Sequence, residues 1–359
     1  NHPNYGSMIP SSKIGDIVHS GPVFKNGVLY TGANDGMLYA LNAETGKEIF
    51  AYVPNLIFDK LARLKDTTYS HTYFVDLPPT VSNINMAGKT TVLIGGLGKG
   101  GKGYFGLDVS GILPSEGQVP GSETSAAARV MWEFPKFNTP ADVLNAMGYS
   151  FSRTAIVKSK YQSSPYVAIF GNGYLSENGT AVLFILNPVT GELIKKIETL
   201  AGPCNGLSTP VAVDGDIDGT VDYVYAGDLQ GNLWKFNLSS DNPADWDVAY
   251  KKDNLPVPLF RTPGQPITTK PDVMYHCAKD GFVVLFGTGR YLDINDVTDN
   301  SQQSVYGIWD FGDDTDPSEY VGSWESGALT NTNLVSTASL LSQTVLDLSL
   351  IHISEPTRQ

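Results

Sequence analysis

Residues 27–50, GVLYTGANDGMLYALNAETGKEIF, contain the pattern that decides the fold. Two short apolar and aromatic runs flank Asp35-Gly36, a pair that favours a tight hairpin turn because glycine readily adopts positive φ angles. A second turn at 42–47 leads into another strand-like run at 48–50. The stretch therefore predicts consecutive antiparallel strands joined by short turns.

The same pattern returns four times further along the chain. The recurrences lie at 91–110, 166–197, 222–239 and 282–310. A repeated sheet with one hairpin per unit is typical of the blades of a β-propeller. We therefore expect an all-β fold, a modified β-propeller. Its blades are expected near 28–50, 91–133, 166–197, 222–247 and 282–310.

The units are longer than compact blades, which take about 40–50 residues. This spacing predicts short helical and loop inserts. One helical insert is expected at 56–64, where Ile57, Leu61 and Leu64 have the spacing of one helix face, and another at 140–144. We expect the propeller domain to cover 1–347, truncated at both ends. The last residues, 348–359, do not continue the pattern and are expected to be a non-native tail translated from a sequencing-library adapter.

Composition excludes several classes of protein. Hydrophobic residues make up 41% of the chain and charged residues only 17%, which argues against a disordered protein. The 24 Lys+Arg against 37 Asp+Glu give a formal net charge of −13, which disfavours a general nucleic-acid or anionic-membrane surface. No run of 18 apolar residues occurs, so no transmembrane segment is expected.

The strongest chemical signal is the loop 214–222, DGDIDGTVD. Its carboxylates occupy positions 1, 3, 5 and 9 of a calcium-loop pattern, and Gly219 at position 6 permits a tight bend. The bidentate Glu of an EF-hand is absent, since Tyr225 stands at position 12, and strands are expected on both sides. The expected Ca²⁺ ligands are Asp214, Asp216, Asp218, Asp222 and the backbone carbonyl of Thr220.

The alternative is a solvated acidic turn. Four aspartates within nine residues would repel one another unless a cation neutralised them. The sequence therefore favours a calcium site over an acidic turn.

Other motifs carry weaker signals. The glycine-rich stretch 95–103 has no Ser or Thr after Lys102 and leads into a strand, so a glycine-rich hairpin is favoured over a phosphate-binding loop. His71 with Asp76 has the residue types of a base and its orienting group, but no nucleophile motif accompanies it, so a hydrogen-bonded structural histidine is favoured. No catalytic residues are expected.

The two cysteines, Cys204 and Cys277, are too few and too distant for a zinc knuckle. His276 next to Cys277 gives only two potential ligands. One disulfide and two separate thiols both remain open.

Ordered blocks along most of 14–347 resemble the C-terminal propeller domain of the PilY/PilC family of type IV pilus biogenesis factors and tip adhesins. A single match to 35–47 would indicate only the wider quinoprotein-like propellers. The blocks include IGDIVHSGPVF (14–24), TVLIGGLGKGGKGYFGLDVS (91–110), GLSTPVAVDGDIDGTVDYVYAGDLQGNLWKFNLS (206–239), LFGTGRYL (285–292) and SVYGIWD (304–310).

This resemblance implies quinoprotein-like blades, calcium at the loop 214–222 and no enzymatic activity. It implies an exported protein at the outer-membrane surface or pilus tip. Such a protein would contact minor pilins and host cells, and would promote pilus extension against retraction. The N-terminal half of the family is absent from this chain, and no Arg-Gly-Asp triplet occurs.

Two alternatives belong to other functional classes. A quinoprotein-type dehydrogenase would share the blades and bind calcium with its quinone, but it usually has vicinal cysteines, whereas these two lie 73 residues apart. A calcium-stabilised scaffold without an adhesive role also fits the sequence.

Overall fold

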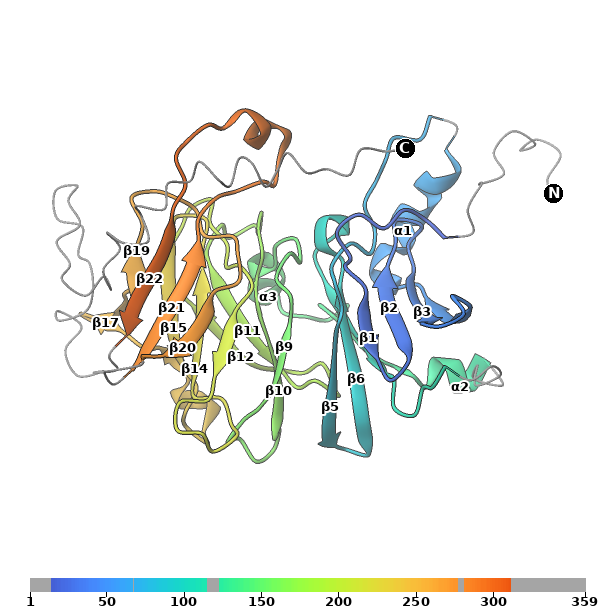
Figure 1. Cartoon of the computed structure of the whole chain (residues 1–359), viewed down its shortest axis with the longest axis horizontal. Helices are drawn as coiled ribbons and strands as arrows, with labels where there is room; N and C mark the ends of the chain where they lie inside the picture. The colour runs from blue at the N-terminus through green and yellow to red at the C-terminus, as the bar shows by residue number, and fades with distance from the viewer. Residues whose placement is uncertain (1–13, 67, 115–122, 277–280, 311–359) are drawn as a thin grey trace. The chain divides into compact units, whose positions relative to one another are not determined.

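The computed structural model describes residues 14–66, 68–114, 123–276 and 281–310. The chain divides into two compact units, Asn1–Thr154 with Pro188–Glu192, and Ala155–Asn187 with Leu193–Gln359. Each unit is built from successive antiparallel sheets (Figure 1). Among the described residues, no helix combines the length and the apolar character needed to cross a bilayer.

The first unit contains two four-stranded sheets. One has the order β1-β2-β3-β4 and the other β5-β6-β7-β8, so each strand pairs with its neighbour in sequence. The strands are β1 (Val23–Lys25), β2 (Val28–Gly32), β3 (Leu38–Asn42), β4 (Glu48–Tyr52), β5 (Thr80–Met86), β6 (Lys89–Gly96), β7 (Tyr104–Asp108) and β8 (Val130–Phe134).

Local chemistry explains the turns of this unit. Gly36 has φ +95° in the β2–β3 hairpin, as the Asp-Gly pair predicts. The glycine-rich stretch forms the β6–β7 connection, with a short 3-10 turn, η3 (Gly98–Gly100), between the strands. The hairpin prediction is confirmed there.

Both helical inserts are confirmed. The first comprises η1 (Asn55–Ile57), α1 (Phe58–Leu61) and η2 (Ala62–Lys65); the second is α3 (Ala141–Ala146). A further helix, α2 (Glu123–Ala127), precedes β8. Ile57 is buried, whereas Leu64 is 39% exposed, so the face expected from the spacing of Ile57, Leu61 and Leu64 is not buried along its whole length. The 3-10 turns break the helical period before Leu64 reaches the core.

The described residues of the second unit form three blade-like sheets. Their orders are β12-β11-β10-β9, β13-β14-β15-β16 with β19 also paired to β15, and β20-β21-β22. The strands are β9 (Ala155–Lys158), β10 (Tyr166–Gly171), β11 (Val182–Leu186), β12 (Leu193–Glu198), β13 (Val211–Val213), β14 (Tyr223–Gly227), β15 (Asn232–Asn237), β16 (Asp247–Val248), β19 (Phe260–Arg261), β20 (Asp272–Tyr275), β21 (Phe282–Gly287) and β22 (Val305–Asp310).

Short elements complete this unit. The strands β17 (Lys251–Lys252) and β18 (Leu255–Pro256) form a small hairpin, and η4 (Pro243–Asp245) and η5 (Ile294–Thr298) are 3-10 turns.

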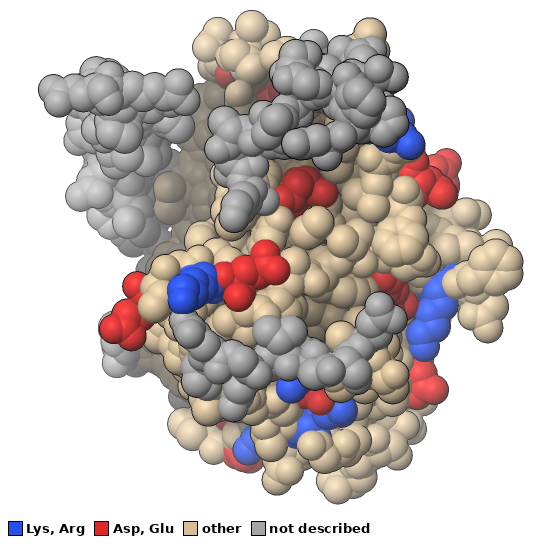
Figure 2. Space-filling model, turned by 90° about the vertical axis from the view of Figure 1, so that its right-hand side faces the viewer, with Lys and Arg blue, Asp and Glu red and all other residues tan. Residues whose placement is uncertain are grey.

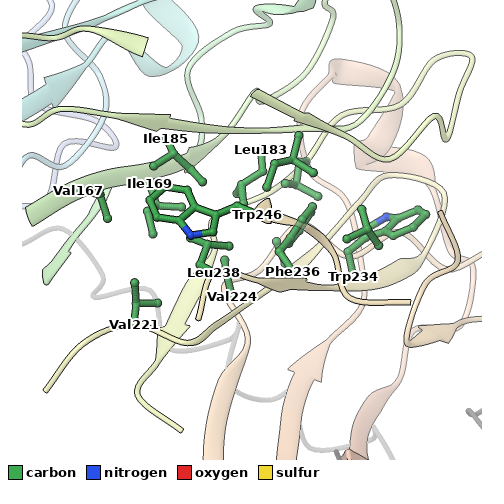
Figure 3. Close-up of a cluster of buried hydrophobic side chains, with 14 of the residues drawn as sticks. Val167, Ile169, Leu183, Ile185, Val221, Val224, Trp234, Phe236, Leu238 and Trp246 are labelled. Atoms are coloured by element: carbon green, nitrogen blue, oxygen red, sulfur yellow. The ribbon is translucent and has the colours of Figure 1, made fainter. Parts of the chain in front are cut away.

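The cores of the second unit lie between neighbouring sheets. One buried cluster joins side chains of β10 and β11 to side chains of β14 and β15, with Trp246 fully buried among them (Figure 3). A second cluster joins Tyr225 and Leu233 to Val284, Phe286 and Ile308. Burial of these alternating apolar side chains fixes the register of each sheet, because a one-residue slip would turn them outward.

The five predicted blades correspond to the five larger sheets of the described residues, which confirms the all-β propeller prediction. Each predicted blade nevertheless begins one strand too late, at β2, β6, β10, β14 or β21. Among the first strands left outside these blades, β13 was expected as the strand before the acidic loop, whereas β1, β9 and β20 contain no fully buried residue. Short strands without buried positions carry little hydrophobic periodicity, so the sequence gives no clear signal for them.

Candidate metal centre

The acidic loop 214–222 joins two paired strands. β13 and β14 are antiparallel, with Val213 opposite Tyr223, and the Asp222 amide donates to the Val213 carbonyl over 2.9 Å. The expectation of flanking strands instead of helices is confirmed. The loop is therefore held at both ends by a sheet.

Backbone amides inside the loop bond to its carboxylates. Gly219, with φ +89°, donates to Asp214 Oδ2 at 2.7 Å, and the Asp218 amide donates to Asp216 Oδ1 at 3.1 Å. Thr220 donates to Asp218 Oδ1 from its amide at 2.7 Å and from its hydroxyl at 2.6 Å. The hydroxyl and amide of Thr220 lower the pKa of Asp218, with Lys160 contributing further. These bonds turn the side chains back over the loop.

Three carboxylates converge in this loop. Asp214, Asp216 and Asp218 each place an oxygen within 4.8 Å of the others. Asp214 Oδ1 is buried and receives no hydrogen bond from the described residues. Burying a charged oxygen without a partner is costly, and hard carboxylate oxygens are the ligands that Ca²⁺ prefers. The residues therefore fit the predicted cation.

Asp222 has a different environment from the other three. Its side chain is 6% exposed, and Oδ2 accepts hydrogen bonds from the amides of Gly215 at 2.7 Å and Asp216 at 3.3 Å. It lies outside the group of three converging carboxylates. Asp222 thus stabilises the start of the loop by accepting these two hydrogen bonds. Direct coordination of Ca²⁺ by Asp222 and by the Thr220 carbonyl stays a prediction.

Lys160 is a site residue that the sequence did not reveal. It follows β9 in the preceding sheet, and its Nζ lies 2.9 Å from Asp222 Oδ1, 3.3 Å from Asp218 Oδ2 and 3.4 Å from Asp216 Oδ2. The hydrogen bond to Asp222 is the main reason that the pKa of Lys160 is raised above its usual value. A separation of more than fifty residues leaves no local pattern that would identify this contact.

Both neighbouring sheets also bond to the loop through other groups. The Val221 amide donates to the carbonyl of Lys158 at the end of β9 over 2.9 Å. On the other side, the hydroxyl of Tyr275 in β20 donates to the Asp214 carbonyl over 3.1 Å. The acidic loop therefore contacts three successive sheets of the second unit.

The histidine considered as a base has another partner. His71 Nε2 lies 2.8 Å from Asp16 Oδ2, whereas Asp76 pairs with His19 Nδ1 at 2.6 Å. Burial raises the pKa of Asp76, although His19 opposes that shift. The suggested His71–Asp76 pair is therefore not formed, and His71 is hydrogen-bonded, as the structural interpretation predicted.

The remaining cysteine and histidine hypotheses concern the second unit. Cys204 is exposed, and Cys277 lies outside the described residues, so the choice between a disulfide and two separate thiols stays open. His276 packs its ring against that of Trp309, with centroids 5.4 Å apart. The tail 348–359 also lies outside the described residues.

Comparison with known proteins assigns the family. A profile of the PilY1 beta-propeller domain matches residues 10–344. The chain is 43% identical over 303 residues to a type IV pilus biogenesis factor PilY1 homolog of Xylella fastidiosa, a match covering 79% of this chain and 19% of that protein. It is 37% identical over 311 residues to the type IV pilus biogenesis factor PilY1 of Pseudomonas aeruginosa strain UCBPP-PA14, covering 79% and 25%.

A solved structure agrees with this assignment. The crystal structure of the Pseudomonas aeruginosa PilY1 C-terminal domain superimposes with a TM-score of 0.62 at 33% identity, covering 79% of this chain and 57% of that one. The chain spans about a fifth to a quarter of the length of these curated relatives. The profile match extends over almost the whole chain and both units. The protein belongs to the PilY1 β-propeller family.

Proposed function

We propose that this chain is the calcium-binding propeller of a type IV pilus biogenesis and adhesion factor. Its relatives are named as type IV pilus biogenesis factors. In this proposal the protein is exported to the cell envelope and acts at the outer-membrane surface or pilus tip. There it contacts pilus components such as minor pilins, and possesses no catalytic activity of its own.

One observation carries the calcium part of the proposal. Three carboxylates converge within 4.8 Å, and a buried oxygen of Asp214 lacks a donor among the described residues. Bound calcium would supply positive charge at that point. The side chains of Asp214, Asp216 and Asp218 would hold it, with Asp222 as the predicted further ligand.

The donor set also suggests the affinity and selectivity. Without the bidentate Glu of an EF-hand, we expect a dissociation constant of roughly micromolar to millimolar, the range of sensors and extracellular modules. Magnesium should bind poorly, because it requires a smaller octahedral shell and retains its waters.

The first test measures binding by calorimetry on the purified chain. The double variant Asp214→Ala plus Asp218→Ala should lose Ca²⁺ binding, because two of the three converging carboxylates are removed. A matched control replaces two exposed aspartates outside the loop, Asp241→Ala plus Asp272→Ala, with the same change in charge. Equal Ca²⁺ binding by both double variants would contradict the site.

The second test connects the loop to pili. In a piliated host strain whose own factor carries the loop substitutions, we expect fewer surface pili and reduced twitching, since calcium at the loop is proposed to favour extension over retraction. The control substitutions should leave both unchanged. Normal piliation and twitching in the loop variant would contradict the role in extension and would favour the alternative, a scaffold that calcium only stabilises.

A quinone absorbance band from purified protein would instead favour the dehydrogenase alternative.

A further inference from the structure

We propose that Lys160 is a tethered competitor of the metal: its ammonium neutralises the acidic loop in the metal-free protein and is displaced when the cation binds. This inference rests on the calcium site proposed above. According to this inference, Lys160, which follows β9 of the preceding sheet, controls the affinity of the site for Ca²⁺.

The position of the ammonium carries the argument. Nζ lies within 3.4 Å of oxygens from Asp216, Asp218 and Asp222. Asp216 and Asp218 belong to the group of three converging carboxylates. A divalent ion held by that group would therefore share oxygens with a positive charge already in contact with them. Like charges at such a separation repel strongly, and the same lone pairs serve only one of them well.

The surrounding backbone allows the side chain to leave without moving the strand. The turn after β9 is closed by hydrogen bonds from the Ser159 amide to the Pro165 carbonyl and from the Ser159 hydroxyl to the Ser164 carbonyl, both 3.0 Å long. The Lys160 side chain itself is 27% exposed. Displacement therefore requires only rotation of a flexible four-carbon chain toward solvent, where the ammonium is well hydrated.

Two consequences follow for the loop. In the metal-free protein, Lys160 reduces the repulsion among the aspartates, so the loop keeps its fold between β13 and β14. In the metal-bound protein, the energy of displacing Lys160 is subtracted from the binding energy, which places the affinity toward the weak end of the calcium range. Lys160 also releases one contact between the loop and the preceding sheet whenever the cation binds.

The first experiment compares Ca²⁺ binding by calorimetry in the unmodified chain, Lys160→Met and Lys158→Met. Lys158 is an exposed lysine two residues away whose side chain forms no ion pair with the described residues, and only its carbonyl bonds to the loop. Both substitutions remove one positive charge. We expect Lys160→Met to bind Ca²⁺ about tenfold more tightly, because a cation in direct contact is removed, and Lys158→Met to change affinity less than about twofold.

The second experiment needs no variant. Amine acylation with a succinimidyl ester, followed by peptide mass spectrometry, measures how freely each lysine reacts. Saturating Ca²⁺ should raise the labelling of Lys160 about threefold or more, because its ammonium leaves the carboxylates, and should leave Lys158 unchanged. Unchanged labelling of Lys160 in a chain that binds Ca²⁺ would overturn the inference.

The outcomes separate the two proposals. If neither the unmodified chain nor Lys160→Met binds Ca²⁺, the calcium site is refuted and the competitor with it. If the unmodified chain binds and Lys160→Met binds equally or more weakly, the calcium site stands and the competitor is refuted. If Lys160→Met does not fold, Lys160→Gln provides the same comparison with a polar side chain.

Discussion

Asp228 is the acceptor for a cluster of buried polar groups in the second unit. It lies in the β14–β15 turn and is fully buried. Its carboxylate accepts hydrogen bonds from Trp234 Nε1 at 2.8 Å, Asn232 Nδ2 at 2.8 Å and Asn205 Nδ2 at 2.9 Å, and from two turn amides. A buried carboxylate is tolerated when its lone pairs are satisfied by donors. Asp228 thereby fixes a tryptophan side chain and a connecting segment to the same turn.

Asp228→Ala should therefore destabilise the protein strongly. The substitution leaves several buried donors without an acceptor, and each such donor costs about 1–3 kcal/mol. We expect a loss of at least about 3 kcal/mol in the free energy of unfolding, measured by urea denaturation. Asp228→Asn, which keeps an acceptor oxygen, should lose less, and the exposed Asp241→Ala should show almost no change. A small effect of Asp228→Ala would mean that water replaces the carboxylate.

At the scale of elements, the β13–β14 hairpin contains the acidic loop and combines order with local strain. Ile217 at the loop tip has φ +66° and is 78% exposed. A β-branched residue rarely adopts that conformation, since it costs about 1–2 kcal/mol for a non-glycine residue. The bonds from Gly219, Thr220 and Lys160 nevertheless hold the loop in one arrangement. These bonds give the hairpin a defined conformation despite the strain at Ile217.

We expect calcium to stabilise this hairpin without being required for the fold. At about a hundred times the dissociation constant, binding adds roughly 2.7 kcal/mol, which orders a loop but does not build the buried cores of the sheets. Ca²⁺ should raise the melting temperature and slow amide exchange at 212–224, while chelator-treated protein stays folded. The Asp214→Ala plus Asp218→Ala variant should show neither effect. Exchange that is identical with calcium and with chelator would identify the loop as a solvated acidic turn.

At the scale of the molecule, a buried ion pair links neighbouring sheets of the second unit. Lys235 Nζ on β15 lies 2.9 Å from Asp310 Oδ2 on β22, and their side chains are 1% and 0% exposed. The hydroxyls of Tyr225 and Tyr250 donate to the same carboxylate at 2.6 and 3.0 Å. The Lys235 ammonium also lies 4.1 Å from the centre of the Tyr223 ring, next to the acidic loop.

Breaking this pair should affect the whole second unit. Asp310→Ala removes the carboxylate from a buried ammonium and two hydroxyls, and we expect a loss of about 3–5 kcal/mol in unfolding free energy, measured by denaturant melts. Asp247→Ala, which breaks the exposed pair with Lys251, should cost under about 1 kcal/mol. The double variant Lys235→Met plus Asp310→Leu should recover part of the loss. Equal effects of Asp310→Ala and Asp247→Ala would refute this role.

Surface charge follows the low charged fraction of the sequence. On the face shown in Figure 2, uncharged residues predominate, and acidic and basic side chains lie interspersed among them.

Local sequence patterns were sufficient to predict the repeated sheets, the position of the acidic loop between two strands and the family. These properties depend on local patterns: alternating apolar residues, Asp-Gly turns, and aspartates at alternate loop positions. The predicted blades left out the first strand of each sheet: β13 was expected only as the strand before the acidic loop, and β1, β9 and β20 have no buried position to mark them.

The groups from distant segments that meet at the loop could be identified only from the packing of the sheets. Lys160, Tyr275 and the bracing role of Asp222 depend on how successive sheets pack, as does the pairing of Asp76 with His19 instead of His71. Lys160 and Asp222, Tyr275 and Asp214, and His19 and Asp76 are each more than fifty residues apart in the sequence. Asp222 and the loop amides that donate to it are close in sequence, but their spacing does not reveal these bonds. The spacing of the aspartates within the loop specifies the ligands that this one segment supplies. The packing of neighbouring sheets determines which charged group of another segment, here the Lys160 ammonium, contacts those ligands.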